Sequence, residues 1–199
     1  VIIMAGTSSR SDRIAELPVH TGPGTPGGDL LRRYWQPVAL SSDVAVGGAP
    51  YPLRIMSEDL VLFRGADGNA GLLALRCAHR LADLSYGRVE DGGLRCVYHG
   101  WLFDAQGRCL EQPGEANGGI HRDRVRQKAY PVVESGGAVW AYMGPGEPPL
   151  FPAYPPVCAP DEFRFTFRWH SNCNYLQANE GNIDPVHTSY LHAFRPDDA

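Results

Sequence analysis

The sequence contains Arg76-Cys77-Ala78-His79-Arg80 and Arg95-Cys96-Val97-Tyr98-His99-Gly100-Trp101. These two stretches indicate the fold more specifically than any other part of the sequence. We call them the first and the second ligand arm. Together they have the pattern C-x-H, sixteen residues, C-x-x-H. Two thiolates and two imidazoles at these spacings indicate metal ligands on two loops that face each other. Zinc sites instead favour C-x₂₋₄-C and H-x₃₋₅-H pairs, whereas each arm here combines one cysteine with one histidine.

The ligand pattern predicts a Rieske-type [2Fe–2S] cluster. In such a cluster two cysteines, here Cys77 and Cys96, bind one iron, and two histidines, here His79 and His99, bind the other. Neutral imidazoles in place of thiolates reduce the negative charge around the cluster and raise its reduction potential. Gly100 fits a tight turn against the cluster. The alternative is a structural zinc module, which would be colourless.

Composition limits the class of protein. The chain has 199 residues, of which 43% are hydrophobic and 20% charged, with a net charge of −4. These values describe a globular protein of one or two domains. The mild acidity argues against nucleic-acid binding, and the apolar runs are too short to span a bilayer. Five cysteines, an odd number without dense spacing, do not form a disulfide framework, so we expect a cytoplasmic protein with no membrane partner.

Residues 29–143 are predicted to form an all-β domain, because short apolar runs alternate with turn signals. The apolar runs are residues 37–40, 53–56, 60–63, 72–75 and 138–142, and the turn signals include Asp67-Gly68, Asp91-Gly92-Gly93 and Gly136-Gly137. Residues 1–28, rich in Gly, Ser, Thr and Pro, are predicted to be irregular. Seven prolines in residues 144–160 predict an extended linker.

Residues 161–199 are predicted to begin a second domain. Aromatic and polar residues alternate over 163–169, which predicts a half-buried strand. Residues 174–193 are predicted to be helical, with interruptions near Gly181 and Pro185. One strand and one helical stretch cannot bury a core, so we expect this domain to be cut short. The fold class is therefore α+β.

A second candidate motif has the pattern D-x-x-H-x₄-H and contains Asp184 and the candidate iron ligands His187 and His192. Two histidines and one carboxylate form the facial triad of non-haem Fe(II) oxygenases. A spacing of five residues does not suit one face of a regular helix, so we expect a π-bulge here. Asp184, directly before Pro185, is predicted to be a helix N-cap. Taken alone, two surface histidines on a helix would be the more frequent explanation.

Of the remaining candidates, the histidines lie in loop-like sequence or after the predicted strand, and the cysteines lack a ligand partner in the sequence. We expect solvated histidines and ordinary buried thiols at these positions. They are His20, His121 and His170, and Cys109, Cys158 and Cys173.

From about Gly24 to His192 the chain resembles the N-terminal part of the large (α) subunits of Rieske non-haem iron oxygenases, in particular the phthalate 4,5-dioxygenase group. Besides the two arms, the resemblance rests on Gly27-Gly-Asp-Leu-Leu-Arg-Arg-Tyr-Trp35, Glu58-Asp-Leu-Val-Leu-Phe63 and Asn174-Tyr-Leu-Gln177. Ala82 and Tyr98 stand where respiratory-type Rieske proteins have disulfide cysteines, which favours the oxygenase type. Leu81 stands where the family usually has glycine, so we expect an altered loop with unchanged ligands.

The resemblance implies a catalytic domain of helix-grip type that begins in residues 161–199. It assigns His187 and His192 to a mononuclear Fe(II) and places the third, carboxylate ligand later than residue 199. A reductase would pass electrons from NAD(P)H to the cluster and on to the Fe(II). This iron would use O₂ to hydroxylate an aromatic substrate, such as an aromatic acid, or to remove a methyl group oxidatively. The substrate and the type of oxygenation stay open.

The resemblance also implies a homotrimer and a catalytic role for Asp184. Asp184 lies three residues before His187, so its carboxylate can accept the outer N–H of that imidazole. Its second oxygen can accept another N–H, and in trimeric relatives this donor is a cluster histidine of the neighbouring subunit, here His99. The alternative class is a Rieske ferredoxin-type electron carrier without a catalytic iron. Two irons per chain indicate the carrier and three indicate the oxygenase.

Overall fold

The computed structural model describes residues 17–90 and 92–193. The chain divides into two compact units, one formed by residues 21–168 and the other including the described residues 17–20 and 169–193. Residues 1–16, the greater part of the segment predicted to be irregular, lie outside the described residues. Within the described ranges no helix has the length and apolar character needed to cross a membrane.

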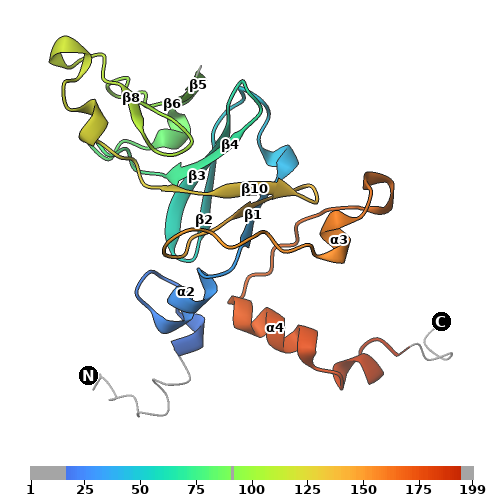
Figure 1. The fold of residues 1–199 in the computed structure, drawn as a ribbon. Coiled ribbons are helices and arrows are strands. Elements are labelled where there is room, and N and C mark those ends of the chain that lie inside the picture. The colour runs from blue at the N-terminus through green and yellow to red at the C-terminus, as the bar shows by residue number, and fades with distance from the viewer. Residues whose placement is uncertain (1–16, 91, 194–199) are drawn as a thin grey trace, which may run out of the picture. The chain divides into compact units, whose positions relative to one another are not determined.

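The unit of residues 21–168 is built from three antiparallel sheets (Figure 1). The first sheet has the order β1 (Gln36–Leu40), β11 (Ala138–Ala141), β10 (Val132–Ser135). The second has the order β2 (Tyr51–Ile55), β3 (Glu58–Arg64), β4 (Ala70–Ala74), β9 (Ala129–Tyr130). The third has the order β5 (Arg88–Glu90), β6 (Gly93–Arg95), β7 (Leu102–Phe103), β8 (Cys109–Glu111). The expected α+β class with a sheet-rich domain is confirmed.

All five apolar runs expected to be strands overlap observed strands, namely β1, β2, β3, β4 and β11. The turn signals at Asp67-Gly68 and Gly136-Gly137 also form turns, whereas Asp91 of the third signal lies outside the described residues. Gly68 between β3 and β4, and Gly136 and Gly137 between β10 and β11, have φ angles of 82°, 67° and 76°, which favour glycine. Met56 and Ser57 form the turn between β2 and β3 with positive φ angles, and no glycine marked that turn in the sequence.

Strand β3 is buried on both faces and separates two hydrophobic cores. Leu60 and Leu62 contribute to one core, and Val61 and Phe63 contribute to the other. This division follows from the two-residue period of a strand, because successive side chains point to opposite faces. The core on the Val61 face also contains Cys77 and Cys96, so the two ligand arms begin in a closely packed interior.

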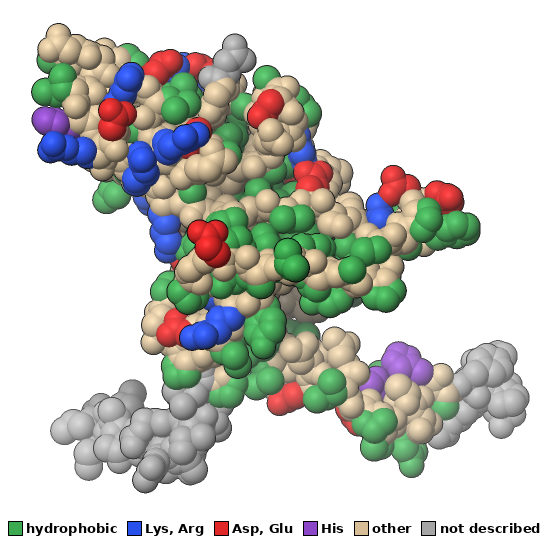
Figure 2. All heavy atoms as spheres, in the orientation of Figure 1, with side chains coloured by type: hydrophobic (Ala, Val, Ile, Leu, Met, Phe, Trp, Pro, Cys, Tyr) green, Lys and Arg blue, Asp and Glu red, His purple; other side chains and the backbone are tan. Residues whose placement is uncertain are grey.

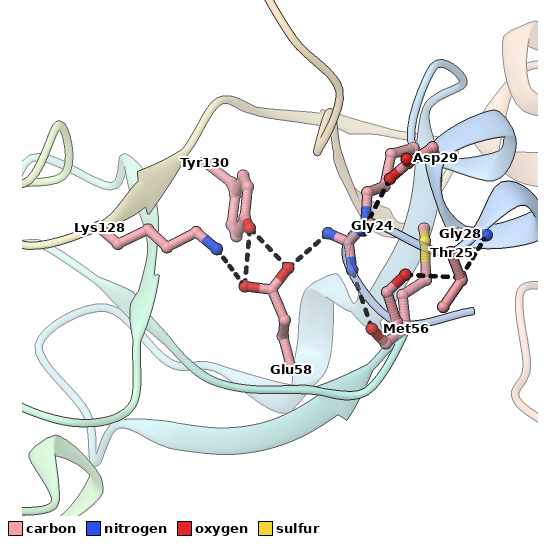
Figure 3. A network of polar contacts seen from close by, with 10 residues as sticks. Gly24, Thr25, Gly28, Asp29, Met56, Glu58, Lys128 and Tyr130 are labelled. Carbon is pink, nitrogen blue, oxygen red and sulfur yellow. Dashed lines mark hydrogen bonds and ion pairs between the residues drawn. The ribbon is translucent and has the colours of Figure 1, made fainter. Parts of the chain in front are cut away.

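Glu58 connects the start of β3 with Arg32, near the beginning of this unit, and with Lys128 and Tyr130 at β9 (Figure 3). It accepts hydrogen bonds from Arg32, Lys128 and the Tyr130 hydroxyl, the last at 2.7 and 2.8 Å. Arg32 also donates to the Met56 carbonyl at 2.9 Å. Burial alone would raise the pKa of Glu58, but the hydrogen bonds from Lys128, Tyr130 and Arg32 outweigh it and lower this pKa below its usual value.

Short helices precede, connect and follow the strands. They are η1 (Leu17–Val19), α2 (Pro26–Leu31), η2 (Ser41–Asp43), η3 (Leu84–Tyr86), η4 (Ala116–Gly118), η5 (Arg122–Arg124), α3 (Pro155–Cys158) and η6 (Asp161–Phe163). Two of them correct the predictions. Helix α2 begins inside the segment predicted to be irregular, because Thr25 caps it by accepting the Gly28 N–H at 3.1 Å and Pro26 occupies its first position. Helix α3 interrupts the predicted extended linker, because its prolines occupy a first turn that needs no N–H donor.

The predicted strand over residues 163–169 is wrong. Phe163, Phe165, Phe167 and Trp169 have exposed fractions between 66% and 86%, and the described chain has no strand over these residues. Alternation indicates an extended segment with two different faces, but a strand also needs a neighbouring strand to bond its backbone groups. No strand in residues 17–90 or 92–193 is paired with this segment.

We call the second unit, with the described residues 17–20 and 169–193, the C-terminal unit. Besides η1 it contains α4 (Tyr175–Ile183) and the single turn η7 (His187–Ser189). Asn174 caps α4 by accepting the N–H groups of Leu176 and Gln177 at 3.0 and 3.1 Å. The helix continues through Gly181 and ends at Asp184, because the residue before a proline disfavours the helical conformation. Asp184 is therefore a C-cap, and the prediction of an N-cap is wrong. The predicted π-bulge is also wrong, because His187 begins a 3-10 turn.

Candidate metal centre

The two ligand arms have the same backbone construction. In the first arm the Cys77 carbonyl accepts the N–H of Leu81, and the Cys77 N–H donates to Ala82, both at 2.9 Å. In the second arm the Cys96 carbonyl accepts the N–H of Gly100 at 3.1 Å, and the Cys96 N–H donates to Trp101 at 2.9 Å. The fifth residue of each turn is left-handed: Leu81 has a φ of 59° and Gly100 a φ of 73°. Two matching turns thus present the four candidate ligands.

The two cysteines form a buried thiol pair. Cys77 is 1% exposed and Cys96 is 3% exposed. Burial, together with the neighbouring Cys96 thiol, raises the pKa of Cys77 to about 11, although backbone N–H groups of His79 and Arg80 donate to the sulfur and act in the opposite direction. Because this pKa is raised, the thiol stays protonated unless a partner such as a metal ion stabilises its thiolate. The thiolate is the form that binds metals.

The two histidines form a second pair nearer the surface. The ring centroids of His79 and His99 are 4.7 Å apart and the rings are inclined at 66°. The indole of Trp101 stacks on His79 at 4.3 Å with an interplanar angle of 3°. Burial, followed by the charges of His99 and Arg80, lowers the pKa of His79. Neutral imidazole is the form that binds metals, so this environment favours ligation.

The donors therefore lie as two pairs, one of thiols and one of imidazoles. In the described part of the chain, no three or more His, Cys, Asp and Glu side chains form one group that could hold a single metal ion. A binuclear cluster with two protein ligands on each iron needs two pairs. The donor set fits such a cluster, while a tetrahedral zinc ion would need all four donors around one point.

The surface beside the arms is positively charged. Arg122, Arg124, Arg126 and Lys128 are exposed in the segment that begins with η5. Figure 2 shows Lys and Arg side chains over the part of the molecule where Figure 1 labels β5, β6 and β8. An open cavity of about 360 Å³ lies beside His79 and is lined by Trp101, Gln112, Glu115, Ile120 and Val125 among others. Residues 122–128 carry four basic side chains and one acidic side chain, Asp123.

In the C-terminal unit His187 lies beside Asp184 and beside His192, but the three side chains do not form one group that could hold a single metal ion. His187 Nδ1 lies 3.5 Å from Asp184 Oδ2, and the rings of His187 and His192 have centroids 5.4 Å apart at 71°. Asp184 Oδ1 accepts the Val186 N–H at 2.8 Å. This hydrogen bond, followed by the charge of His187, lowers the pKa of Asp184. The carboxylate is thus held in its charged form beside the imidazole.

The remaining expected residues give a mixed result. Cys109 is buried as predicted, but Cys158 and Cys173 are exposed, because the linker and the C-terminal unit provide them with no core. His20, His121 and His170 are exposed as predicted. The sequence did not predict the stacking of Trp101 on His79 or the contact of Gln127 with the first arm. Only the position of Trp101 at the end of the second ligand arm could have indicated that it stacks on His79.

Comparison with known proteins finds one matching domain family and several similar oxygenase subunits. Residues 34–132 match the Rieske [2Fe-2S] domain family. The chain is 46% identical over 190 residues to the 5,5'-dehydrodivanillate O-demethylase oxygenase subunit of Sphingobium sp. (strain NBRC 103272 / SYK-6), covering 94% of this chain and 44% of that protein. It is 42% identical over 172 residues to the phthalate 4,5-dioxygenase oxygenase subunit of Pseudomonas putida, covering 84% and 39%.

Among solved structures, the crystal structure of dicamba monooxygenase bound to dicamba is similar with a TM-score of 0.68 and 29% identity. The match covers 81% of this chain and 48% of that chain. The chain spans less than half the length of these relatives. Residues 34–132 of the chain therefore belong to the Rieske [2Fe-2S] domain family, and the longer similarity to oxygenase subunits includes the region that contains the paired arms.

Proposed function

We propose that Cys77 and Cys96 bind one iron of a [2Fe–2S] cluster and that His79 and His99 bind the other. The observation that supports this most is the pair of matching turns, which present a buried thiol pair and a more exposed imidazole pair. A cluster bound here would supply one-electron transfer through its histidine side. The protein's own part is to keep the thiols dry, to orient His79 against Trp101 and to leave His99 accessible.

We further propose that the whole protein is the terminal oxygenase component of a multicomponent system. Residues 29–143 would be the Rieske domain, 144–160 the linker and 161–199 the opening of a helix-grip catalytic domain. His187 and His192 would hold a mononuclear Fe(II), whose chemistry is O₂ activation. Electrons would come from NAD(P)H through a reductase. The names of the similar proteins, an O-demethylase and a dioxygenase among them, support hydroxylation or oxidative demethylation of an aromatic substrate, for example an aromatic acid.

The proposed assembly is a cytoplasmic homotrimer without nucleic-acid or membrane partners. In it Asp184 would connect His187 of one subunit with His99 of the next. The 3.5 Å separation of Asp184 Oδ2 from His187 Nδ1 supports the first half of this bridge, and the second carboxylate oxygen can accept another N–H. Asp184→Asn in the full-length protein should leave both metals bound but slow oxidation of the reduced cluster. Unchanged single-turnover kinetics would reject the bridge.

The function is tested by spectroscopy and metal analysis. The purified chain should be red-brown and give the EPR signal of a reduced Rieske centre. The full-length protein should contain three irons per subunit. Two irons per subunit would indicate a ferredoxin-type carrier, and a colourless zinc protein would refute the cluster.

A further inference from the structure

Gln127 is a buried polar residue that lies two positions before β9. It is 3% exposed, so its side-chain amide cannot be solvated and must find its hydrogen-bond partners within the protein. An unpaired amide in such a place would destabilise the folded chain. Where its hydrogen bonds go therefore shows what the residue holds in place.

All side-chain hydrogen bonds of Gln127 go to the backbone of the first arm and the residues leading into it. Its Oε1 accepts the N–H of Ala78, the residue between the two candidate ligands of that arm, at 2.7 Å. Its Nε2 donates to the carbonyls of Ala74 at 2.7 Å and Arg76 at 3.0 Å. Both N–H groups and the carbonyl oxygen are thus used, and one side chain fixes three peptide groups on either side of Cys77.

The backbone of Gln127 is attached to a different sheet. Its N–H donates to the Gly107 carbonyl at 2.8 Å. Gly107 lies in the turn between β7 and β8, with a φ of 76°, and a Cβ there would lie 2.0 Å from the Gln127 carbonyl oxygen. Only glycine permits this approach. The sheet of β5 to β8 contains the second arm between β6 and β7, so Gln127 joins that sheet to the first arm.

We propose that Gln127 is a positioning residue that fixes the first arm relative to the second and thereby sets the reduction potential and retention of the cluster. The inference rests on the proposed function. The turn that Gln127 anchors at Ala78 includes the backbone N–H groups of His79 and Arg80, which would donate to the Cys77 sulfur in the bound cluster. Hydrogen bonds to ligand sulfur stabilise the reduced, more negative cluster. If the turn loosens, these bonds lengthen and the potential falls.

The test compares Gln127→Met with Gln36→Met in the purified, cluster-containing chain. Methionine keeps the length and shape of glutamine but removes its hydrogen bonds. Gln36 is a matched control, because its Nε2 also donates to a backbone carbonyl, that of Leu31 at 2.8 Å, and contacts neither arm. Three properties are measured: the EPR g-values of the reduced cluster, its reduction potential, and the rate of iron loss to a chelator.

Gln127→Met should shift the g-values, lower the potential and accelerate iron loss about tenfold, the factor that corresponds to 1.4 kcal/mol. Gln36→Met should behave as the wild type in all three. A merely structural role would lower the unfolding temperature of either variant without moving the potential. Equal potentials and chelation rates for Gln127→Met and wild type, or equal changes in both variants, would overturn the inference.

A second measurement covers the case in which Gln127→Met does not fold. Hydrogen–deuterium exchange of the wild-type chain should show the Ala78 amide protected to the level of the β4 amides, although Ala78 lies in an exposed part of the loop. Exchange as fast as in an open loop would overturn the inference. Failure of the proposed function is distinguishable, because then the wild type itself would lack the Rieske EPR signal.

Discussion

The chain contains two histidine pairs of similar geometry on very different supports. The ring centroids of His79 and His99 are 4.7 Å apart at 66°, and those of His187 and His192 are 5.4 Å apart at 71°. The first pair lies on turns closed by backbone hydrogen bonds above a packed core with two buried thiols. The second lies around a single 3-10 turn, after a helix with no buried residue. Ring geometry alone therefore does not distinguish the sites; the surroundings that fix each ring do.

The largest expected effect concerns the thiol pair. Cys96→Ser should abolish the cluster, with loss of the red-brown colour and of the EPR signal, because it removes one of two ligands of an iron. Cys109→Ser is the matched control: Cys109 is 4% exposed against 3% for Cys96, but it does not belong to the pair. Cys109→Ser should keep the cluster. A cluster that survives Cys96→Ser and is lost in Cys109→Ser would reverse the assignment.

The next prediction separates the two histidine pairs. His187→Ala in the full-length protein should remove the mononuclear iron and turnover, because the site loses an imidazole ligand. The cluster spectrum should persist, because His187 belongs to the other unit. Iron analysis should then give two irons per subunit in place of three. His170→Ala, at another exposed histidine of the same unit, should retain all three. Loss of the cluster in His187→Ala would contradict the independence of the two sites.

The sequence predicted that the two arms face each other, and the rings of His79 and His99 lie 4.7 Å apart, because the residues of each arm are close in sequence and its turn needs little else. That these residues bind a cluster stays a prediction. The sequence predicted the five strands β1, β2, β3, β4 and β11 but missed the other six, β5 to β10, which have two to four residues each and are too short to show alternation. It failed at residues 163–169, where alternation was present but no partner strand pairs with the segment in the described chain. It could not predict Gln127, because the residue lies 49 positions from Ala78 and only the packing of two sheets brings them together.

The stability of the cluster-bearing unit is expected to depend on Glu58. Glu58→Gln should lower the free energy of unfolding at pH 7 by about 2 kcal/mol, because it removes the charge that Arg32 and Lys128 share. The pKa of Glu58 is lowered in the folded chain, so its contribution is complete above the unfolded value of 4.5 and is lost as the pH falls through the folded value. Urea unfolding at several pH values measures the difference.

The control for this prediction is Glu111→Gln. Glu111 also pairs with an arginine, Arg95, but its side chain is 52% exposed, so the loss should stay below about 0.5 kcal/mol. A difference between wild type and Glu58→Gln that grows as the pH falls would contradict the sign derived from the pKa. Equal losses in both variants would show that the burial of Glu58 contributes nothing.

The smallest expected effect concerns the one difference between the two matching turns of the arms. Leu81 and Gly100 occupy equivalent left-handed positions, but only glycine adopts this conformation without strain. The side chain of Leu81 is 69% exposed, so little packing is lost when it is removed. Leu81→Gly should therefore raise the free energy of unfolding by about 0.5 to 1 kcal/mol, the left-handed strain less the added entropy of the unfolded chain. Leu81→Ala keeps the Cβ and the strain, so its free energy of unfolding should not rise. Thermal unfolding of the wild type and both variants measures the difference. If both variants were stabilised equally, the cause would be removal of the exposed apolar side chain. Relief of left-handed backbone strain at Leu81 would then not explain the stabilisation.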